Sequence, residues 1–465
     1  MLRRAAHNER VRVPAPLVRR RLPTGRGAIE QPNAGDDGPA ALTPVFWAAV
    51  AVTGIASGLF GDLLMFLLFH VEHWAFGYDS GSLLDGVRQA SNLRRVLSLV
   101  IAGVFGGVAW YLLRRFAKGD TEVDDSLWRG TGKLAFWRSL GTSGISEVVI
   151  GMGASIGREA APKLMGGASG SVIAGWARLT PSQRRLLVSC GAGSGLAAVY
   201  NVPIGGALFT AEVLVGSIAL PVILPALACS AIATATARWY LADHATYIGI
   251  PHFHSSSRLV IWAILLGPLA GLVAAGYIRL LGWIAYRRVT GALLLISMPV
   301  GFGILGLLGI PYPQLFGNGS AIVGETFFGG GGLTLLLVLF LLKPLVTAMC
   351  LGVGASGGLF TPVLSVGALF GAFLGLAWSH LWPGTPLGAY AMVGAAAMVG
   401  AAMQAPLAAL VIVIELTDSG LGLTLPMIAA TVIATAVTRY LDGYSIYSAR
   451  LPGLPPAAGS GAPAA

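Results

Sequence analysis

Residues Ser155 to Gly170 read S-I-G-R-E-A-A-P-K-L-M-G-G-A-S-G, and they set an arginine and a glutamate between two apolar, glycine-rich stretches. An ionisable side chain at membrane depth costs about 2.5 to 3.5 kcal/mol on insertion scales, so such residues usually mark a transport path or a binding site. Glu159 therefore requires a functional explanation.

The residues around Glu159 predict a helix that begins inside the membrane. Gly153 and Gly157 loosen the backbone before the charged pair, and Pro162 suits the first turn of a helix because its missing N–H would have no partner there. A helix start presents unpaired N–H groups and the positive end of the helix dipole, which together bind anions. Glu159 would then be the protein's own anion, competing for this site.

The composition places the whole chain in a membrane. Of its 465 residues, 55% are hydrophobic and 11% are charged, whereas soluble chains carry roughly a quarter charged residues. Apolar runs of the length that spans a bilayer recur from about Val45 to Leu441, and the short alternation of a membrane β-barrel is absent from the sequence. We expect an all-α polytopic membrane protein, in contact with the lipid bilayer and not with nucleic acid.

The net charge of +10 reflects membrane orientation. Arginines are concentrated before the first apolar run, at Arg3, Arg4, Arg10, Arg12, Arg19, Arg20, Arg21 and Arg26. By the positive-inside rule the N-terminus lies in the cytoplasm, and we expect an integral protein of the plasma membrane, which is the inner membrane in bacteria. Residues 1–43 are interpreted as a basic mobile tail, and residues 451–465 as a low-complexity tail.

The second half of the chain repeats the first. Ser155 to Pro162 aligns with Ser356 to Pro362, and Asn201 to Glu212 aligns with Gln404 to Glu415 at nearly the same offset. Two ordered pairs in register predict a duplicated fold whose site lies between the repeats. We assign residues 44–242 to the first transmembrane repeat, 243–257 to a connecting loop and 258–450 to the second repeat.

These motifs resemble the CLC family of chloride channels and proton-coupled chloride antiporters over residues 44–450. The resemblance rests on G-R-E-A-A-P, G-G-L-F-T-P, N-V-P-I-G-G-A-L-F, Q-A-P-L-A-A-L-V and E-L-T-D in this order, and on Tyr447 in G-Y-S-I-Y-S. It implies a CLC-like fold with two inverted-topology repeats and broken helices. It further implies a homodimer in which each subunit has its own anion path.

The resemblance also implies roles for individual residues. Glu159 would be the gating glutamate, whose carboxylate occupies an anion position and leaves it when protonated or displaced. The anion-binding residues would be Leu359, Phe360, Tyr447, Gly157 and Arg158. Helix-end partial charges suit this task, because a full lysine charge beside the anion would hold it too tightly for rapid transit.

Two positions depart from the family pattern. Lys118 stands where the family has a chloride-coordinating serine, and it is a candidate anion-attracting residue of the inner vestibule. Val213 stands where the antiporters have an inner glutamate, and valine cannot relay a proton. This replacement favours uncoupled conduction, unless Glu212 or Glu147 supplies the proton path instead.

The sequence thus predicts transport of chloride or a similar small inorganic anion, through a channel or by exchange for protons. A repeat-type secondary transporter of a larger organic anion is the alternative, and it would explain Lys118. A membrane-embedded enzyme has little support, because His252 and His254 stand in a loop without acidic or cysteine partners. Neither a metal nor a cofactor is expected. Gly191, Gly193 and Gly195 predict close helix packing rather than a dinucleotide-binding loop.

Overall fold

The computed structural model describes residues 40–119, 121–419 and 421–451. Most of the predicted N-terminal tail and nearly all of the predicted C-terminal tail lie outside these residues. Within them the chain is helical, and eight helices are long and apolar enough to cross a membrane. The predicted all-α polytopic membrane fold is confirmed.

The first half of the chain, from α1 to α9, contains one π-helical segment, η1, at Glu212. Its elements are α1 (Pro44–Phe76), α2 (Leu83–Gln89), α3 (Asn92–Phe116), α4 (Val123–Trp128), α5 (Phe136–Gly151), α6 (Ala160–Trp176), α7 (Pro181–Tyr200), α8 (Pro203–Phe209), η1 (Thr210–Val215) and α9 (Leu220–Ala237).

The second half follows after a connection without regular structure. Its elements are α10 (Ser257–Tyr286), η2 (Gly291–Leu293), α11 (Leu294–Leu308), η3 (Pro313–Leu315), α12 (Ser320–Phe327), α13 (Leu333–Gly352), α14 (Phe360–Ser379), α15 (Leu387–Met403), α16 (Pro406–Thr417), α17 (Thr424–Leu441) and η4 (Ser448–Arg450).

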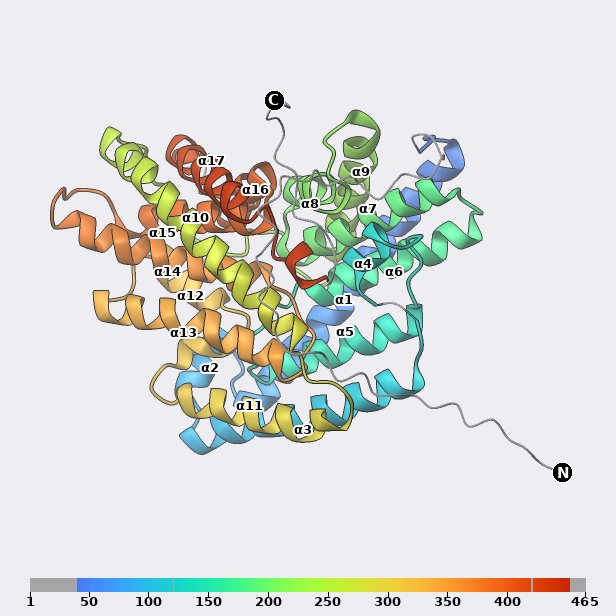
Figure 1. Cartoon of the computed structure of the whole chain (residues 1–465), viewed down its shortest axis with the longest axis horizontal. Helices are drawn as coiled ribbons and strands as arrows, with labels where there is room; N and C mark the ends of the chain where they lie inside the picture. The colour runs from blue at the N-terminus through green and yellow to red at the C-terminus, as the bar shows by residue number, and fades with distance from the viewer. Residues whose placement is uncertain (1–39, 120, 420, 452–465) are drawn as a thin grey trace, which may run out of the picture.

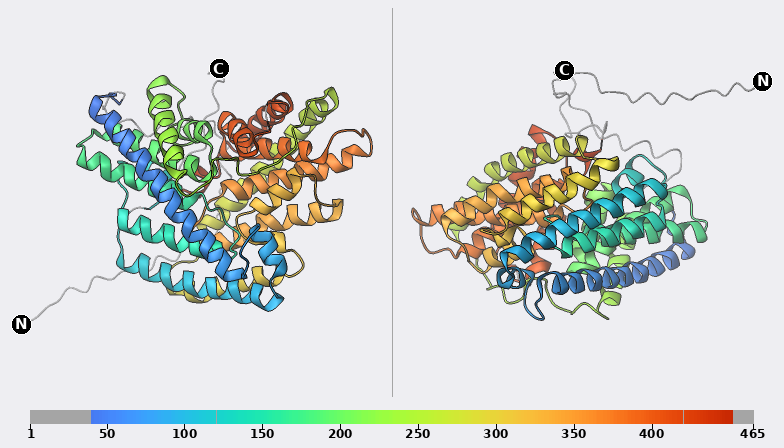
Figure 2. Two further views of the ribbon diagram at one scale, coloured as in Figure 1. Left: turned by 180° about the vertical axis from the view of Figure 1, so that it is seen from behind. Right: turned by 90° about the horizontal axis from the view of Figure 1, so that it is seen from below.

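The two halves repeat one another in helix order, with α6 to α9 matching α14 to α17. The first half forms much of the right side of the molecule in Figure 1 and the second half much of the left side, while α3 and α11 run side by side along the bottom. Many helices are tilted and cross one another, and α1 is the long blue diagonal in the left view of Figure 2. The sequence motifs that align with each other therefore lie in corresponding helices of the two halves.

Corresponding helices end by the same local device. Asn201 ends α7 and Gln404 ends α15, and both residues take the left-handed conformation, with φ of 55° and 57°. A proline follows two residues later and occupies the first turn of the next helix, α8 or α16. Because proline lacks an N–H, it is well tolerated at this position. Both turns therefore follow from the local sequence.

Each half also caps a helix of the other half. The carboxylate of Glu212 accepts hydrogen bonds from the N–H groups of Leu407 and Ala408 at the start of α16, at 3.3 and 2.6 Å. The carboxylate of Glu415 accepts bonds from Ile204 and Gly205 at the start of α8, at 3.1 and 2.7 Å. A two-fold axis produces such reciprocal contacts between equivalent residues. Inverted repeats are related by an axis of this kind.

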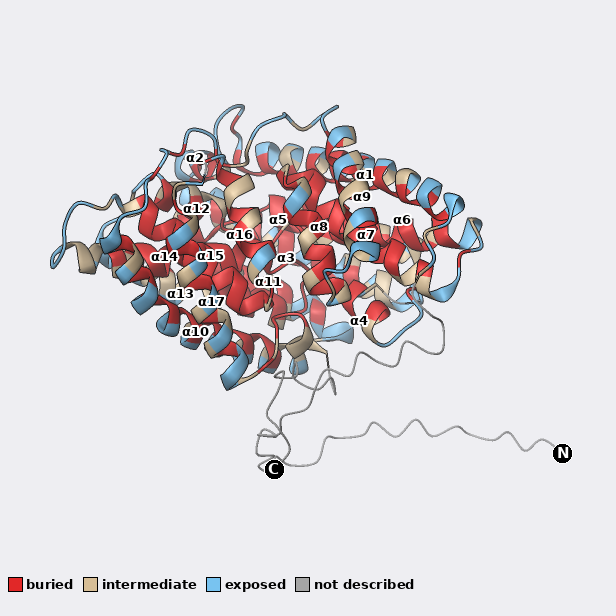
Figure 3. Cartoon of the chain, turned by 90° about the horizontal axis from the view of Figure 1, so that it is seen from above, coloured by how far each residue is buried: buried red, intermediate tan, exposed pale blue. Residues whose placement is uncertain are grey.

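Small residues bring the central helices together. A Cβ atom at Gly166 of α6 would overlap the carbonyl oxygen of Gly191 of α7, and one at Gly195 would overlap that of Pro162. The predicted role of these α7 glycines in close packing is confirmed. Buried residues fill the middle of the molecule, and exposed ones lie mainly at its edges and ends (Figure 3). Most residues of α6 and α14 are buried.

Candidate anion site

Two helices begin in the interior of the protein, at one shared backbone contact. Gly157 and Gly358 form an antiparallel bridge, in which each N–H donates to the other residue's carbonyl oxygen at 2.8 and 2.7 Å. Helix α6 begins at Ala160, three residues after Gly157, and α14 begins at Phe360, two residues after Gly358. The predicted interruptions before Pro162 and Pro362 therefore both occur, and they meet.

The carboxylate of Glu159 lies on the start of α14. Its Oε1 accepts a hydrogen bond from the backbone N–H of Phe360 at 2.7 Å. Its Oε2 accepts bonds from the hydroxyls of Tyr200 at 3.2 Å and Thr361 at 3.3 Å. Because the residue is only 4% exposed, these donors and the helix dipole replace the hydration of the charge. The start of one broken helix thus holds the side chain that precedes the other.

A buried lysine and a half-buried arginine hold the two loops that lead into these helices. Lys343 of α13 donates from Nζ to Ser155 Oγ at 2.7 Å and to the carbonyl oxygen of Gly317 at 3.0 Å. Arg288 donates from Nη2 to Ser356 Oγ at 2.7 Å and to the carbonyl oxygen of Gly354 at 2.9 Å. These bonds fix the loop before each helix start, so the position of the carboxylate does not depend on its own contacts alone.

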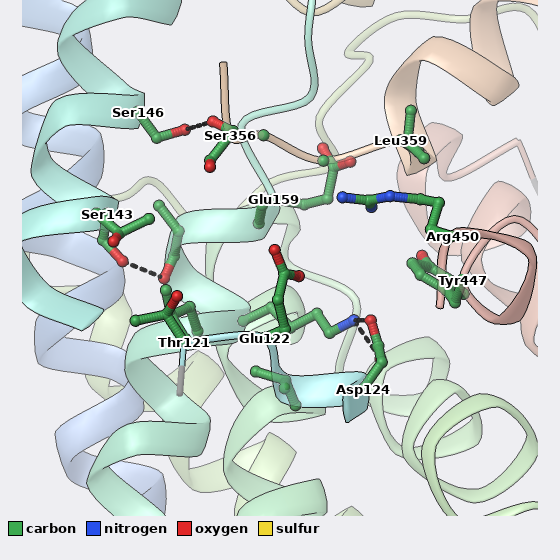
Figure 4. A pocket seen from close by; sticks show the side chains of 18 residues that line it. Thr121, Glu122, Asp124, Ser143, Ser146, Glu159, Ser356, Leu359, Tyr447 and Arg450 are labelled. Carbon is green, nitrogen blue, oxygen red and sulfur yellow. Dashed lines mark hydrogen bonds and ion pairs between the residues drawn. The ribbon is translucent and has the colours of Figure 1, made fainter. Parts of the chain in front are cut away.

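Glu159 lines a cavity of about 70 Å³ together with Leu359, Tyr447 and Arg450. In Figure 4 the side chains of Glu122 and Arg450 also point into this space, from different parts of the chain. We call it the inner cavity. Its wall contains both charged groups and the start of α14.

A second, larger hollow of about 1240 Å³ lies beyond Glu159, and we call it the outer basin. Arg158 and Tyr200 line it. The hydroxyl of Tyr200 donates to Glu159, which lines the inner cavity. The Glu159 carboxylate and the Tyr200 ring therefore lie between the two spaces.

Three of the five predicted anion-binding residues lie close to Glu159, and the other two make different contacts. Leu359, Phe360 and Tyr447 are close to Glu159, through the inner cavity or a direct bond. The N–H of Gly157 donates its hydrogen bond to the carbonyl oxygen of Gly358 and not to an anion. The guanidinium of Arg158 lies over the ring of Tyr200, 5.1 Å from its centroid, and faces the outer basin.

The remaining candidates lie elsewhere. Lys118 is exposed, and from its loop Thr121 and Glu122 line the inner cavity instead. Glu212 caps α16 through both carboxylate oxygens. Glu147 of α5 is fully buried, and its two oxygens have no hydrogen-bond partner among the described residues. Val213 is buried as well.

Several residues at the site were not singled out in the sequence. Tyr200 and Thr361 bind Glu159 directly, and each stands within or beside a quoted motif. Lys163 follows Pro162 and forms an ion pair with Asp124, with Nζ to Oδ1 at 2.8 Å. Lys163 could have been found in the sequence, because it is a charged residue directly after the predicted helix start.

Comparison with known proteins agrees with this geometry. The model of the family described as "Voltage gated chloride channel" matches residues 103–439. The chain belongs to the voltage-gated chloride channel family. Members of this CLC family are transport proteins, and the chain is accordingly not an enzyme.

Curated relatives in the CLC family include H(+)/Cl(−) exchange transporters of Yersinia and Vibrio. The H(+)/Cl(−) exchange transporter ClcA of Yersinia pseudotuberculosis serotype IB (strain PB1/+) is 29% identical over 385 residues, which cover 79% of this chain and 80% of the relative. ClcA of Vibrio campbellii (strain ATCC BAA-1116) is 27% identical over 442 residues, covering 91% and 92%. These relatives support anion transport as the general activity of the chain.

Solved CLC structures have the same fold. A slow cyanobacterial Cl−/H+ antiporter superposes with a TM-score of 0.77 at 25% identity, covering 88% of this chain and 97% of that one. A CLC-type fluoride/proton antiporter superposes with a TM-score of 0.70 at 21% identity, covering 87% and 97%. The predicted CLC-like architecture is confirmed.

Proposed function

We propose that this chain moves chloride or a similar small inorganic anion across the membrane, and that Glu159 is its gate. The observation that supports this most directly is the bond between the Glu159 carboxylate and the N–H of Phe360. The carboxylate is an anion at the start of a buried helix, where the backbone favours negative charge. A transported anion would take the same place when the carboxylate leaves.

Protonation or displacement of Glu159 opens the path in this proposal. A neutral carboxyl group loses most of its attraction to the start of α14 and to the hydroxyl donors of Tyr200 and Thr361. When the side chain moves away, the inner cavity and the outer basin are joined beside Tyr200. The hydroxyl of Tyr447, whose residue lines the inner cavity, then serves as a donor to the anion.

The size of the inner cavity favours a small ion over the organic-anion alternative. Its volume is about 70 Å³, whereas pockets for drug-sized organic ligands measure roughly 300 to 1,000 Å³. A halide with one or two waters fits this space. A larger organic anion would require the helices around it to separate.

Exchange of chloride for protons is the form of transport that we propose first. The curated relatives are named H(+)/Cl(−) exchange transporters, and they match most of this chain. Val213 supports the second candidate, passive conduction, because it offers no proton-binding group at the inner relay position.

A liposome experiment tests both statements. Purified protein is reconstituted with internal chloride, and a potassium ionophore clamps the voltage while chloride and proton electrodes record together. Chloride efflux well above that of empty liposomes is expected, with uphill proton movement under a chloride gradient. Retention of chloride as in empty liposomes would defeat the transport proposal, and chloride efflux without proton movement would establish passive conduction.

We further infer a homodimer in the bacterial inner membrane, with the N-terminus in the cytoplasm. The family resemblance supports the dimer, and the arginines before α1 support the orientation. Cross-linking in membranes at low protein density is expected to give a dimer band. Labelling of an N-terminal tag only after the membrane is permeabilised would agree with the orientation, and labelling of intact spheroplasts would contradict it.

A further inference from the structure

A buried ion pair lies one helical turn from Glu159. The ammonium of Lys163 contacts both carboxylate oxygens of Asp124, at 2.8 and 2.9 Å (Figure 4, at Asp124). The N–H of Lys163 bonds the carbonyl oxygen of Glu159 at 3.1 Å, so the two side chains leave the same first turn of α6. Each side chain of the pair is 11% exposed. The pair thus places two opposite full charges beside the candidate anion site.

The pair is part of the cavity wall. Lys163 and Asp124 both line the inner cavity, and Asp124 also lines an adjoining cavity with Arg288 and Arg450. The Lys163 ammonium lies over the ring of Tyr447, 4.4 Å from its centroid. An ammonium on a ring face keeps part of its stabilisation when its carboxylate partner changes. The lysine can therefore turn toward an anion in the cavity without being left unsupported.

We propose that Asp124 and Lys163 form a site that binds a small anion and a proton together. When Asp124 is ionised, it occupies the lysine. When Asp124 takes up a proton, the Lys163 ammonium is available to an anion from the cavity. The total charge is the same in both states, since one negative ion replaces another beside the lysine, and so the exchange avoids an uncompensated buried charge.

The two binding events must then favour each other. If protonation of Asp124 tightens anion binding at Lys163, anion binding favours protonation of Asp124 by the same factor. This inference rests on the proposed transport of a small anion. It also supplies a carboxylate that can take up protons at the inner cavity, whereas Val213 has no proton-binding group.

Other charged or titratable groups face this site from every neighbouring element. They are Glu122 at the start of α4, Glu159 before α6, Arg288 after α10, and Tyr447 and Arg450 near the C-terminus. Glu159 and Glu122 are the carboxylates that an experiment must separate from Asp124.

The test measures chloride binding to the detergent-purified protein by calorimetry at pH 5.5 and pH 7.5. Glu159→Gln removes the gating carboxylate, and in this background we expect chloride to bind about tenfold more tightly at the lower pH. Adding Asp124→Asn to this variant should give tight chloride binding at both pH values. Equal affinity at both values in Glu159→Gln alone would overturn the proposal.

Two further variants keep the result decisive. Glu122→Gln in the Glu159→Gln background should keep the pH dependence; its loss there would assign the proton to Glu122 and overturn the proposal. In the same Glu159→Gln background, Asp124→Asn together with Lys163→Met removes both charges of the pair, which avoids an unpaired buried lysine. This variant should bind chloride weakly and equally at both values, and retained pH dependence would exclude the pair. Absence of chloride flux in the unaltered protein would instead sink the proposed function.

Discussion

Gly157 and Gly358 hold equivalent positions in the two repeats, and their backbones pair with each other in an antiparallel bridge, through bonds of 2.8 and 2.7 Å. Antiparallel pairing of equivalent residues is what a two-fold relation between repeats produces. The bridge brings the starts of α6 and α14 to one point. Glu159 therefore reaches the N–H of Phe360 across the repeat interface.

Replacing Glu159 tests the gate. Glu159→Gln cannot ionise, and at chloride concentrations that saturate its binding site it should give chloride flux that is high throughout the range from about pH 4.5 to 7.5. The unaltered protein should conduct more as the pH falls, because protonation releases the carboxylate. Flux from liposomes at a series of pH values measures this. Glu325→Gln, at a half-buried carboxylate of the outer basin, is the control, and an unchanged pH profile in Glu159→Gln would remove Glu159 from the role.

Replacing Tyr200 tests the hydrogen bonds to the docked carboxylate. Tyr200→Phe removes a donor to a charged group, and such bonds contribute about 1.5 to 3 kcal/mol. Since roughly 1.4 kcal/mol corresponds to one pH unit, the pH of half-maximal flux should rise by about one unit. Tyr390→Phe is the matched control, because that buried hydroxyl has no hydrogen-bond partner among the described residues. A fall in the half-maximal pH would contradict the assignment.

A methyl group at Gly358 tests the docking geometry. A Cβ at this position would overlap Oε1 of Glu159, so Gly358→Ala should expel the carboxylate and raise chloride flux at neutral pH. Gly175→Ala, also in the region of α6, is the control, since no described atom lies within 4 Å of a Cβ there. Flux at neutral pH equal to that of the unaltered protein, in a variant that remains folded by size-exclusion chromatography, would show that the carboxylate does not block the path.

The cap on α16 predicts a structural role for Glu212. Glu212→Ala and Glu415→Ala should each lower the free energy of unfolding by about 1 kcal/mol, because each leaves two helix-start N–H groups without their acceptor. The ratio of proton to chloride movement should not change in either variant. Thermal unfolding in detergent and the liposome assay measure these quantities. Loss of proton movement in Glu212→Ala, but not in Glu415→Ala, would assign Glu212 to the proton path.

The interruption of α6 and α14 could be predicted because its causes are local. Glycines before Glu159 and Phe360, and the prolines that follow, act through the backbone of their own segment. The repeat could be recognised for the same reason. Asn201 and Gln404 stand at equivalent positions of the two halves, and each ends a helix through its own left-handed conformation. Local chemistry is fully present in the sequence.

The partners of the charged side chains could not be predicted in this way. Glu212 is a candidate proton carrier from its place in the sequence, which does not indicate that its carboxylate contacts the start of α16, 195 residues away for the nearer partner. Lys163 and Asp124 are 39 residues apart, and neither spacing nor periodicity indicates that α4 and α6 bring them together. Lys118 was chosen by its distance from Glu159 along the chain, whereas the turn after it presents Glu122 to the cavity.

The reciprocal caps of Glu212 and Glu415 have a consequence for biogenesis. When a ribosome has completed only the first half, α8 still lacks the carboxylate that will close its start, and Glu212 has no helix to close. Neither half can reach its final form until the last helices have entered the bilayer. A cut in the 243–257 connection should therefore be tolerated when both fragments are made in the same cell, while either fragment alone should be degraded.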